Sequence, residues 1–290
     1  MSAAAWALVL SGAAFHALWN IVAKRTQGGT AFVWLFGVVS VVAFAPLALW
    51  EAGHGLQALT PAMSAAVCAS ALIHVVYSLV LQRGYRDAPF SVVYPVARGS
   101  GPMFSIATAI CLWGERPNAW GWMGVLAVLA GIVVSAGSPA GAREKSADTR
   151  AMSGVGWGLA TGLCIAGYTV VDGWAVKQLG MSPLLFYGAG LALRTGLLAP
   201  MALSERDALR EQWRRSRRAI LIVGLLSPAA YTLVLMAVRM APLSYVAPVR
   251  EVSMLIGTFL GAHLLRESIR GRNVAGAALM LSGVIAIALA

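Results

Sequence analysis

Residues 88–96 read APFSVVYPV and residues 241–249 read APLSYVAPV, so one motif occurs twice at an offset of 153 positions. Residues 77–81 match residues 231–235 in a similar way. After a one-residue slip, three further positions correspond: Glu115 with Glu267, Gly124 with Gly276, and Gly131 with Gly283. The chain is therefore an internal duplication, with a first repeat over 1–138, a second over 153–290 and a short linker over 139–152.

The composition of the whole chain is that of a membrane protein. Of the 290 residues, 59% are hydrophobic and 11% are charged, and the mean hydropathy is +0.75. Soluble domains typically have about 45–50% apolar and about 25% charged residues. The three cysteines lie inside apolar runs, which excludes a secreted disulfide scaffold. A chain of this size and composition has too few charged residues to form the polar surface of a soluble protein. The sequence therefore predicts an integral membrane protein.

Each repeat contains five stretches that are long enough to cross a bilayer. A membrane-spanning helix needs about 20 mainly apolar residues. Ten stretches meet this criterion, at about 4–23, 31–50, 62–82, 89–113, 118–137, 153–176, 183–203, 219–238, 242–265 and 272–290. None shows the alternating polarity of barrel strands, so we predict an all-α fold. Because five is odd, the repeats must be oppositely oriented, which predicts ten transmembrane helices in two inverted five-helix repeats.

Basic residues are unevenly distributed among the connections. The loops after odd-numbered spans hold 16 Lys and Arg, and the loops after even-numbered spans hold three. Cytoplasmic loops carry the excess of positive charge, so this bias predicts that both termini are periplasmic. The net charge is +11, but the basic residues flank apolar segments without the aromatic interleaving of a nucleic-acid groove. We therefore expect no nucleic-acid partner.

Five charged side chains fall inside predicted spans, where each costs about 2.5–3.5 kcal/mol unless it faces a cavity or a partner. They are Arg98, Asp172, Arg194, Arg250 and Glu251. Arg98 and Glu251 occupy equivalent repeat positions, so a pseudo-two-fold axis would bring them together near the middle of the membrane. Two interpretations remain open: a buried pair that holds the repeats together, or a pair that lines and gates a substrate cavity. Three Arg against two carboxylates favour a zwitterion or an organic anion as substrate.

Aromatic and polar residues at helical spacing complete the expected substrate site. The site would consist of Trp19, Asn20, Tyr77, Tyr94, Arg98, Tyr168, Arg250 and Glu251. Glu251, Asp172 and His74 are candidates for proton coupling, because a desolvated carboxylate beside a cation can change its charge when its partner moves. For His74, an interhelical hydrogen bond is at least as good an interpretation.

Prolines interrupt corresponding spans of the two repeats. Pro95 and Pro102 fall in the fourth stretch, and Pro248 falls in the ninth. Each proline removes an intrahelical hydrogen bond, and paired interruptions in two repeats indicate the binding site and the hinge of a transporter. A static kink is the alternative interpretation.

These features together resemble the EamA family of the drug/metabolite transporter superfamily. The resemblance rests on the ten-span duplication, the Ala-Pro opening of the fourth and ninth spans, and Glu115 and Glu267 before the fifth and tenth. The segment HALWN at 16–20, followed by Lys24 and Arg25, is similar to the first helix of one subgroup, some of whose members are associated with phosphonate-use loci. The resemblance covers essentially the whole chain. It implies a basket of helices with a central cavity, and export or import of small polar metabolites.

The chain departs from the family in one respect. Typical relatives carry basic residues after the second span and at the C-terminus, which implies cytoplasmic termini, whereas this chain has Lys or Arg at neither place. The charge bias and the resemblance therefore predict opposite orientations, and we follow the charge bias.

The leading hypothesis is a secondary carrier of the bacterial inner membrane that moves a small polar or amphipathic metabolite by alternating access. The alternatives are a channel or lipid scramblase with a continuous polar path, and a membrane-embedded enzyme. The sequence has no Cys-x-x-Cys or His-x-x-x-His pair and no glycine-rich phosphate loop. We therefore expect no metal, no cofactor and no enzymatic activity. The expected partners are a small-molecule substrate and the lipid bilayer, with protons as a candidate coupling ion.

Overall fold

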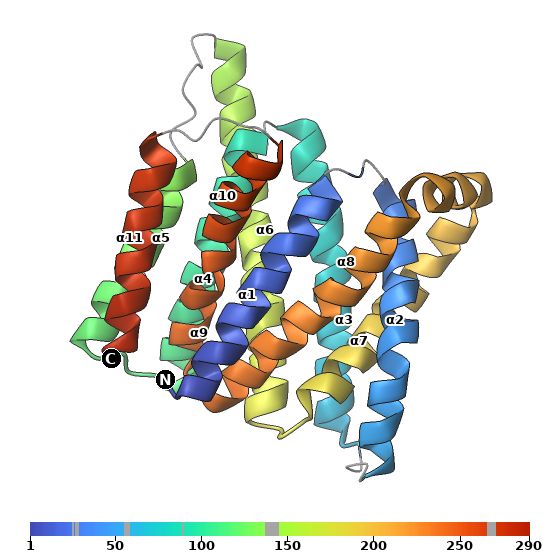
Figure 1. Cartoon of the computed structure of the whole chain (residues 1–290), viewed down its shortest axis with the longest axis horizontal. Coiled ribbons are helices and arrows are strands. Elements are labelled where there is room, and N and C mark those ends of the chain that lie inside the picture. Colours follow the sequence, from blue (N-terminus) through green and yellow to red (C-terminus); the bar gives the residue numbers. More distant parts are fainter. Residues whose placement is uncertain (25, 27–28, 55–58, 89, 137–144, 266–270) are drawn as a thin grey trace. The chain divides into compact units, whose positions relative to one another are not determined.

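A computed structural model describes residues 1–24, 26, 29–54, 59–88, 90–136, 145–265 and 271–290. All regular secondary structure of these residues is helical (Figure 1). The helices are α1 (Ala3–Lys24), α2 (Gly29–Gly53), α3 (Pro61–Asp87), α4 (Phe90–Trp113), α5 (Ala119–Ala136), α6 (Lys145–Lys177), α7 (Pro183–Leu203), α8 (Arg206–Met240), α9 (Leu243–Arg250), α10 (Val252–Leu265) and α11 (Gly271–Ala288). The all-α prediction is confirmed for the described residues.

Six of the described helices, α1 to α3 and α6 to α8, are long and apolar enough to cross a membrane. Shorter apolar helices occur at Ala119–Val134 and Val274–Ala288. Large apolar side chains such as Val42, Leu49 and Leu163 are 66%, 71% and 63% exposed. Apolar surface of this kind on long apolar helices fits a hydrocarbon environment better than water. The chain is a multi-pass membrane protein.

The ninth predicted stretch contains a helix break. α9 ends at Arg250 and α10 begins at Val252, with Glu251 between them at φ −70° and ψ −7°. Pro248 lies inside α9, three residues before the break, and has no backbone N–H to donate to the carbonyl oxygen of residue 244. The predicted interruption of the fourth stretch is wrong, because α4 is continuous across Pro95 and Pro102. A membrane helix tolerates proline where neighbouring groups satisfy the freed backbone.

The chain folds into two compact units that differ from the two repeats. Unit one comprises Met1–Ala3, Ile73–Val171 and Met240–Ala290, and unit two comprises Ala4–Leu72 and Asp172–Arg239. Each unit thus takes residues from both sequence halves. The predicted boundaries at 1–138 and 153–290 describe the repeats in the sequence. Of the predicted linker, 139–144 lies outside the described residues, and from Lys145 onward the chain belongs to α6.

In unit one, α5 and α11 lie side by side (Figure 1), and glycines lie at their contact. A Cβ atom on Gly124 would lie 2.6 Å from the carbonyl oxygen of Gly283, and one on Gly131 would lie 2.6 Å from that of Gly276. Small residues allow the backbones of membrane helices to approach this closely. The four glycines that the repeats share therefore lie at one helix contact, where each faces the equivalent of the other glycine on its partner helix: Gly124 faces Gly283, and Gly131 faces Gly276.

Unit two is held together by α2, α7 and α8. The indole Nε1 of Trp34 donates to the carbonyl oxygen of Thr195 at 3.2 Å, which joins α2 to α7. The hydroxyl of Ser40 donates to the carbonyl oxygen of Gly224 at 2.7 Å, which joins α2 to α8. Interhelical hydrogen bonds of this kind contribute, together with close packing, to the association of helices within lipid.

Candidate functional site

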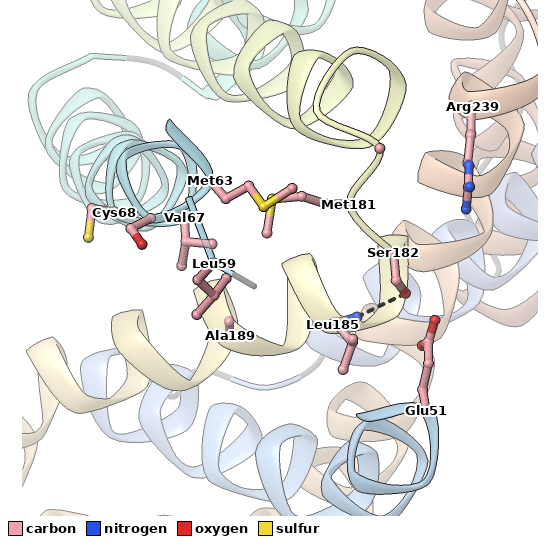
Figure 2. Close-up of a pocket in the computed structure, with 12 residues that line it drawn as sticks. Glu51, Leu59, Met63, Val67, Cys68, Met181, Ser182, Leu185, Ala189 and Arg239 are labelled. Carbon is pink, nitrogen blue, oxygen red and sulfur yellow. Dashed lines mark hydrogen bonds between the residues drawn. The ribbon is translucent and has the colours of Figure 1, made fainter. Parts of the chain in front are cut away.

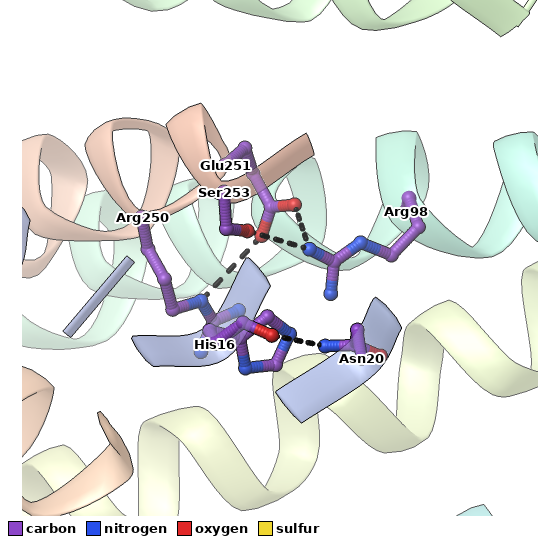
Figure 3. A network of polar contacts seen from close by, with 6 residues as sticks. All are labelled: His16, Asn20, Arg98, Arg250, Glu251 and Ser253. Carbon is purple, nitrogen blue, oxygen red and sulfur yellow. Dashed lines mark hydrogen bonds and ion pairs between the residues drawn. The ribbon is translucent and has the colours of Figure 1, made fainter. Parts of the chain in front are cut away.

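The centre of the candidate site is an ion pair in unit one. The guanidinium Nη2 of Arg98, on α4, lies 2.7 Å from the carboxylate Oε2 of Glu251, at the α9–α10 break (Figure 3). The Glu251 side chain is 1% exposed and the Arg98 side chain is 16% exposed. The predicted approach of these two repeat-related residues is confirmed.

A second arginine shares the same carboxylate. The Nε atom of Arg250 lies 3.5 Å from Oε1 of Glu251, and its side chain is buried. Arg98 Nη2 also donates to the hydroxyl of Ser253 at 3.3 Å. We call Arg98, Arg250 and Glu251 the charged triad. It has two positive charges and one negative charge, so its formal net charge is +1.

The helix break positions the charges of the triad. Arg250 is the last residue of α9 and Glu251 immediately precedes α10. A cation is favoured at a helix C-terminus and an anion at a helix N-terminus, because the end groups of the helix carry partial charges. In membrane carriers, broken helices of this kind frequently hold the substrate. The break therefore places two oppositely charged side chains at adjacent helix ends.

Glu115 fixes the beginning of the same broken helix. Its Oε1 and Oε2 accept hydrogen bonds from the backbone N–H groups of Leu243 and Ser244, both at 2.9 Å. The first N–H groups of a helix have no intrahelical acceptor, so a carboxylate there satisfies them and interacts favourably with the helix end. Glu115 was expected only as a marker of the repeat, and its role as a cap was not.

An aromatic cluster in unit one unites three of the predicted site residues. The rings of His74 and Tyr168 stack with centroids 4.1 Å apart, and Tyr77 meets Tyr168 edge-on at 5.8 Å. His74 and Tyr77 lie on α3, and Tyr168 lies on α6. The structure thus brings Tyr77, Tyr168 and His74 together, and their roles in substrate binding and proton coupling stay predictions.

Asp172 belongs to a separate polar cluster in unit two. It is fully buried, and its Oδ2 accepts a hydrogen bond from the hydroxyl of Tyr231 at 2.6 Å. The Tyr231 ring lies 4.9 Å from that of Tyr187, whose hydroxyl accepts a hydrogen bond from Arg194 Nη2 at 2.6 Å. The two tyrosines thus connect an acidic and a basic side chain. Neither tyrosine is among the predicted site residues, although Tyr231 begins the segment that repeats residues 77–81.

Two further predicted site residues, Trp19 and Asn20, make contacts outside the charged triad, and the side chain of a third is not described. Trp19 packs against a cluster of Phe32, Ile220 and Val223 in unit two. The side-chain amide of Asn20 donates to the backbone carbonyl of His16 at 2.7 Å, within α1. Neither contact by itself indicates a substrate. The side chain of Tyr94 lies outside the described part of the structure.

The candidate site has no metal-binding arrangement among the residues that the structure describes. Among these, no group of three His, Cys, Asp or Glu side chains is arranged to hold a metal ion. The candidate site is therefore built from guanidinium, carboxylate, hydroxyl and aromatic groups. Such groups bind charged organic molecules by hydrogen bonds and ion pairs.

Comparisons with known proteins agree with a helical membrane protein of two homologous halves. The model of the EamA-like transporter family matches residues 3–137 and again residues 152–289. The chain belongs to this family, and its members are membrane transporters of the drug/metabolite superfamily. A solved crystal structure is similar in fold, with a TM-score of 0.75, 18% sequence identity and 98% of each chain covered. A comparison with curated proteins found none that matches this sequence.

Proposed function

We propose that this protein is a secondary transporter that moves a small polar or amphipathic metabolite across the bacterial inner membrane by alternating access. The observation that carries the proposal is the charged triad at a helix break, in a chain whose two halves both match a transporter family. Buried charges inside membrane helices are expensive and mark substrate or ion pathways.

The proposed architecture has ten spans in two inverted repeats. It adds α4, α5, α11 and the broken α9–α10 segment to the six helices that meet the length and hydropathy criteria of a span. With five spans in each repeat, the halves take opposite orientations. Both termini are then periplasmic, because the loops after odd-numbered spans hold most of the basic residues.

The charge of the triad favours a zwitterion or an organic anion as substrate. Arginine can bind a carboxylate or a phosphorus oxyanion through two parallel hydrogen bonds. Glu251 balances one arginine in the absence of substrate, and contacts a substrate amine or takes up a proton in its presence. The break between Arg250 and Val252 supplies a hinge beside the charges.

Two experiments test this function. The purified protein is first screened by thermal shift against amino acids and small organic acids, because a ligand that binds only the folded state raises its stability. The best ligand is then used in proteoliposomes. A carrier gives saturable uptake that is stimulated by unlabelled ligand on the opposite side. Flux that neither saturates nor responds to the opposite side would contradict the carrier and support a channel.

A further inference from the structure

Unit two contains a cavity of about 530 Å³ that the substrate prediction did not include (Figure 2). It lies where α2 ends, α3 begins, α6 connects to α7, and α8 ends. Most of its wall is apolar and comes from Leu59, Met63, Val67, Met181, Leu185 and Ala189. Small-molecule pockets typically have volumes of about 300–1,000 Å³ and mainly apolar walls with a few polar groups. This cavity has the size and lining of such a pocket.

Local backbone features shape the wall. Gly180 has φ +67°, a left-handed conformation that lets the chain reverse between α6 and α7. Ser182 then caps α7, with its hydroxyl accepting a hydrogen bond from Leu185 N at 3.3 Å. The Thr60 hydroxyl accepts a hydrogen bond from Met63 N at 3.2 Å, at the start of α3. These caps hold both methionine-bearing segments in place, and methionine adapts its shape to varied apolar ligands.

Two opposite charges line one side of the cavity. Figure 2 shows Glu51, Ser182 and Arg239 on one side, and Met63, Val67 and the Cys68 thiol on the other. Glu51 comes from the last turn of α2 and Arg239 from the last turn of α8. With the described residues, neither side chain forms a hydrogen bond or an ion pair. Both charges are thus available to a molecule in the cavity.

We propose that this cavity is a second binding site, and that its ligand is an apolar zwitterion. The ammonium of the ligand would pair with Glu51, and its carboxylate or phosphate with Arg239. Its apolar body would lie against Met63, Val67 and Met181. A zwitterion forms two ion pairs with these side chains, whereas a ligand with one charge forms one. The cavity therefore selects for both charges together with an apolar group.

The proposed binding site in this cavity does not depend on the proposed transport function. The charged triad belongs to unit one, whereas every residue that lines this cavity belongs to unit two. Binding at the cavity can be measured without transport. A negative result here would leave the transport proposal intact, and a failure of transport would leave the binding site testable.

The thiol of Cys68 provides a direct measurement, because it is exposed and lines the cavity. In a variant with Cys111→Ala and Cys164→Ala, Cys68 is the remaining cysteine. The rate of its reaction with a maleimide is measured in detergent with and without millimolar L-phenylalanine. We expect L-phenylalanine to slow labelling several-fold. Phenylacetate and phenethylamine, which each lack one charge, should have much weaker effects.

Substitutions of the charged residues test the pairing. Glu51→Gln and Arg239→Gln should each abolish protection, expressed for each variant as the ratio of its labelling rates without and with ligand, and Arg239→Lys should retain part of the protection. Lys177→Gln is the matched control, because Lys177 ends α6 and does not line the cavity. The melting temperature of each variant and its elution as a single species in size-exclusion chromatography show that the variant is folded. Protection that persists in both Gln variants would overturn the proposal.

The zwitterion can also come from the bilayer. The same labelling is therefore repeated in nanodiscs of phosphatidylglycerol with and without phosphatidylethanolamine. Protection by the phospholipid that requires Glu51 and Arg239 would support the site and identify a lipid as its ligand. If neither L-phenylalanine nor phosphatidylethanolamine slows the labelling of Cys68, or if the three phenyl compounds protect equally, the proposal is wrong.

Discussion

The guanidinium of Arg98 and the carboxylate of Glu251 meet at 2.7 Å, although the residues are 153 positions apart and occupy equivalent places in the two repeats. A duplication would initially place the same residue at both positions. Opposite charges at the two positions turn a like-charge or apolar contact into an attractive one. The pair thus joins the two repeats within unit one. Arg98 on α4 supplies the positive charge, and Glu251 at the α9–α10 break supplies the negative charge.

We predict that removing Glu251 destabilises the protein more than removing Arg98. Glu251→Gln removes the carboxylate that both arginines contact, whereas Arg98→Gln leaves Arg250 beside it. Breaking a buried pair by removing one partner costs about 3–5 kcal/mol. Unfolding of the purified variants by heat or SDS measures the difference. Equal stability of Glu251→Gln and wild type would show that the pair does not stabilise the fold.

Gly124→Ala should destabilise the contact between α5 and α11. The new Cβ would lie 2.6 Å from a backbone oxygen, so the helices must separate, and overpacking of this kind costs about 1–3 kcal/mol. Gly156→Ala is the control, because a Cβ there meets nothing within 4 Å. Alanine favours a helix over glycine by about 0.5–1 kcal/mol, so the control should be neutral or stabilising. If the two variants melt at the same temperature, the close glycine contact is wrong.

Tyr231→Phe should lower stability by about 1–3 kcal/mol, because it removes a hydrogen bond to the buried carboxylate of Asp172. Tyr245→Phe is a suitable control. Tyr245 is also buried, but its hydroxyl makes no hydrogen bond with a described residue. A Tyr231→Phe variant with the melting temperature of the Tyr245→Phe variant would contradict the predicted contribution of this bond.

Reporter fusions test the orientation. An alkaline phosphatase fused after Ala290 should be active, because the enzyme folds only in the periplasm, and a fusion within the basic segment 206–218 should be inactive. Activity of a cytoplasmic reporter at Ala290 would instead support the orientation typical of the family. The orientation derived from loop charge would then be wrong.

Hydropathy predicted the helices well, because a span needs a minimum length of apolar residues. The stretch 183–203 has the bounds of α7. The repeat predicted the meeting of Arg98 and Glu251, because symmetry supplies a long-range contact that local patterns lack. Helical spacing assigned Trp19 to a polar face, whereas it packs in an apolar cluster. Spacing defines a face of a helix, but the neighbour of that face depends on packing.

The unpredicted features depend on contacts between helices that are distant in sequence. Tyr187 and Tyr231 lie on α7 and α8 and connect Arg194 with Asp172 only after these helices pack. The cavity beside Glu51 and Arg239 is formed by four helices and a turn. Neither arrangement follows from periodicity, because each requires the relative rotation of several helices.

Transport by Arg98→Gln and Glu251→Gln in proteoliposomes tests the central claim most directly. The rates are compared at equal amounts of folded protein across pH 5–8, with the ligand identified by thermal shift. Tyr245→Phe serves as the folded control. If the charged triad binds substrate, both Gln variants lose most of the saturable uptake while the control retains it. If both variants fold and transport at the wild-type rate at every pH, the triad is structural and the proposed site is wrong.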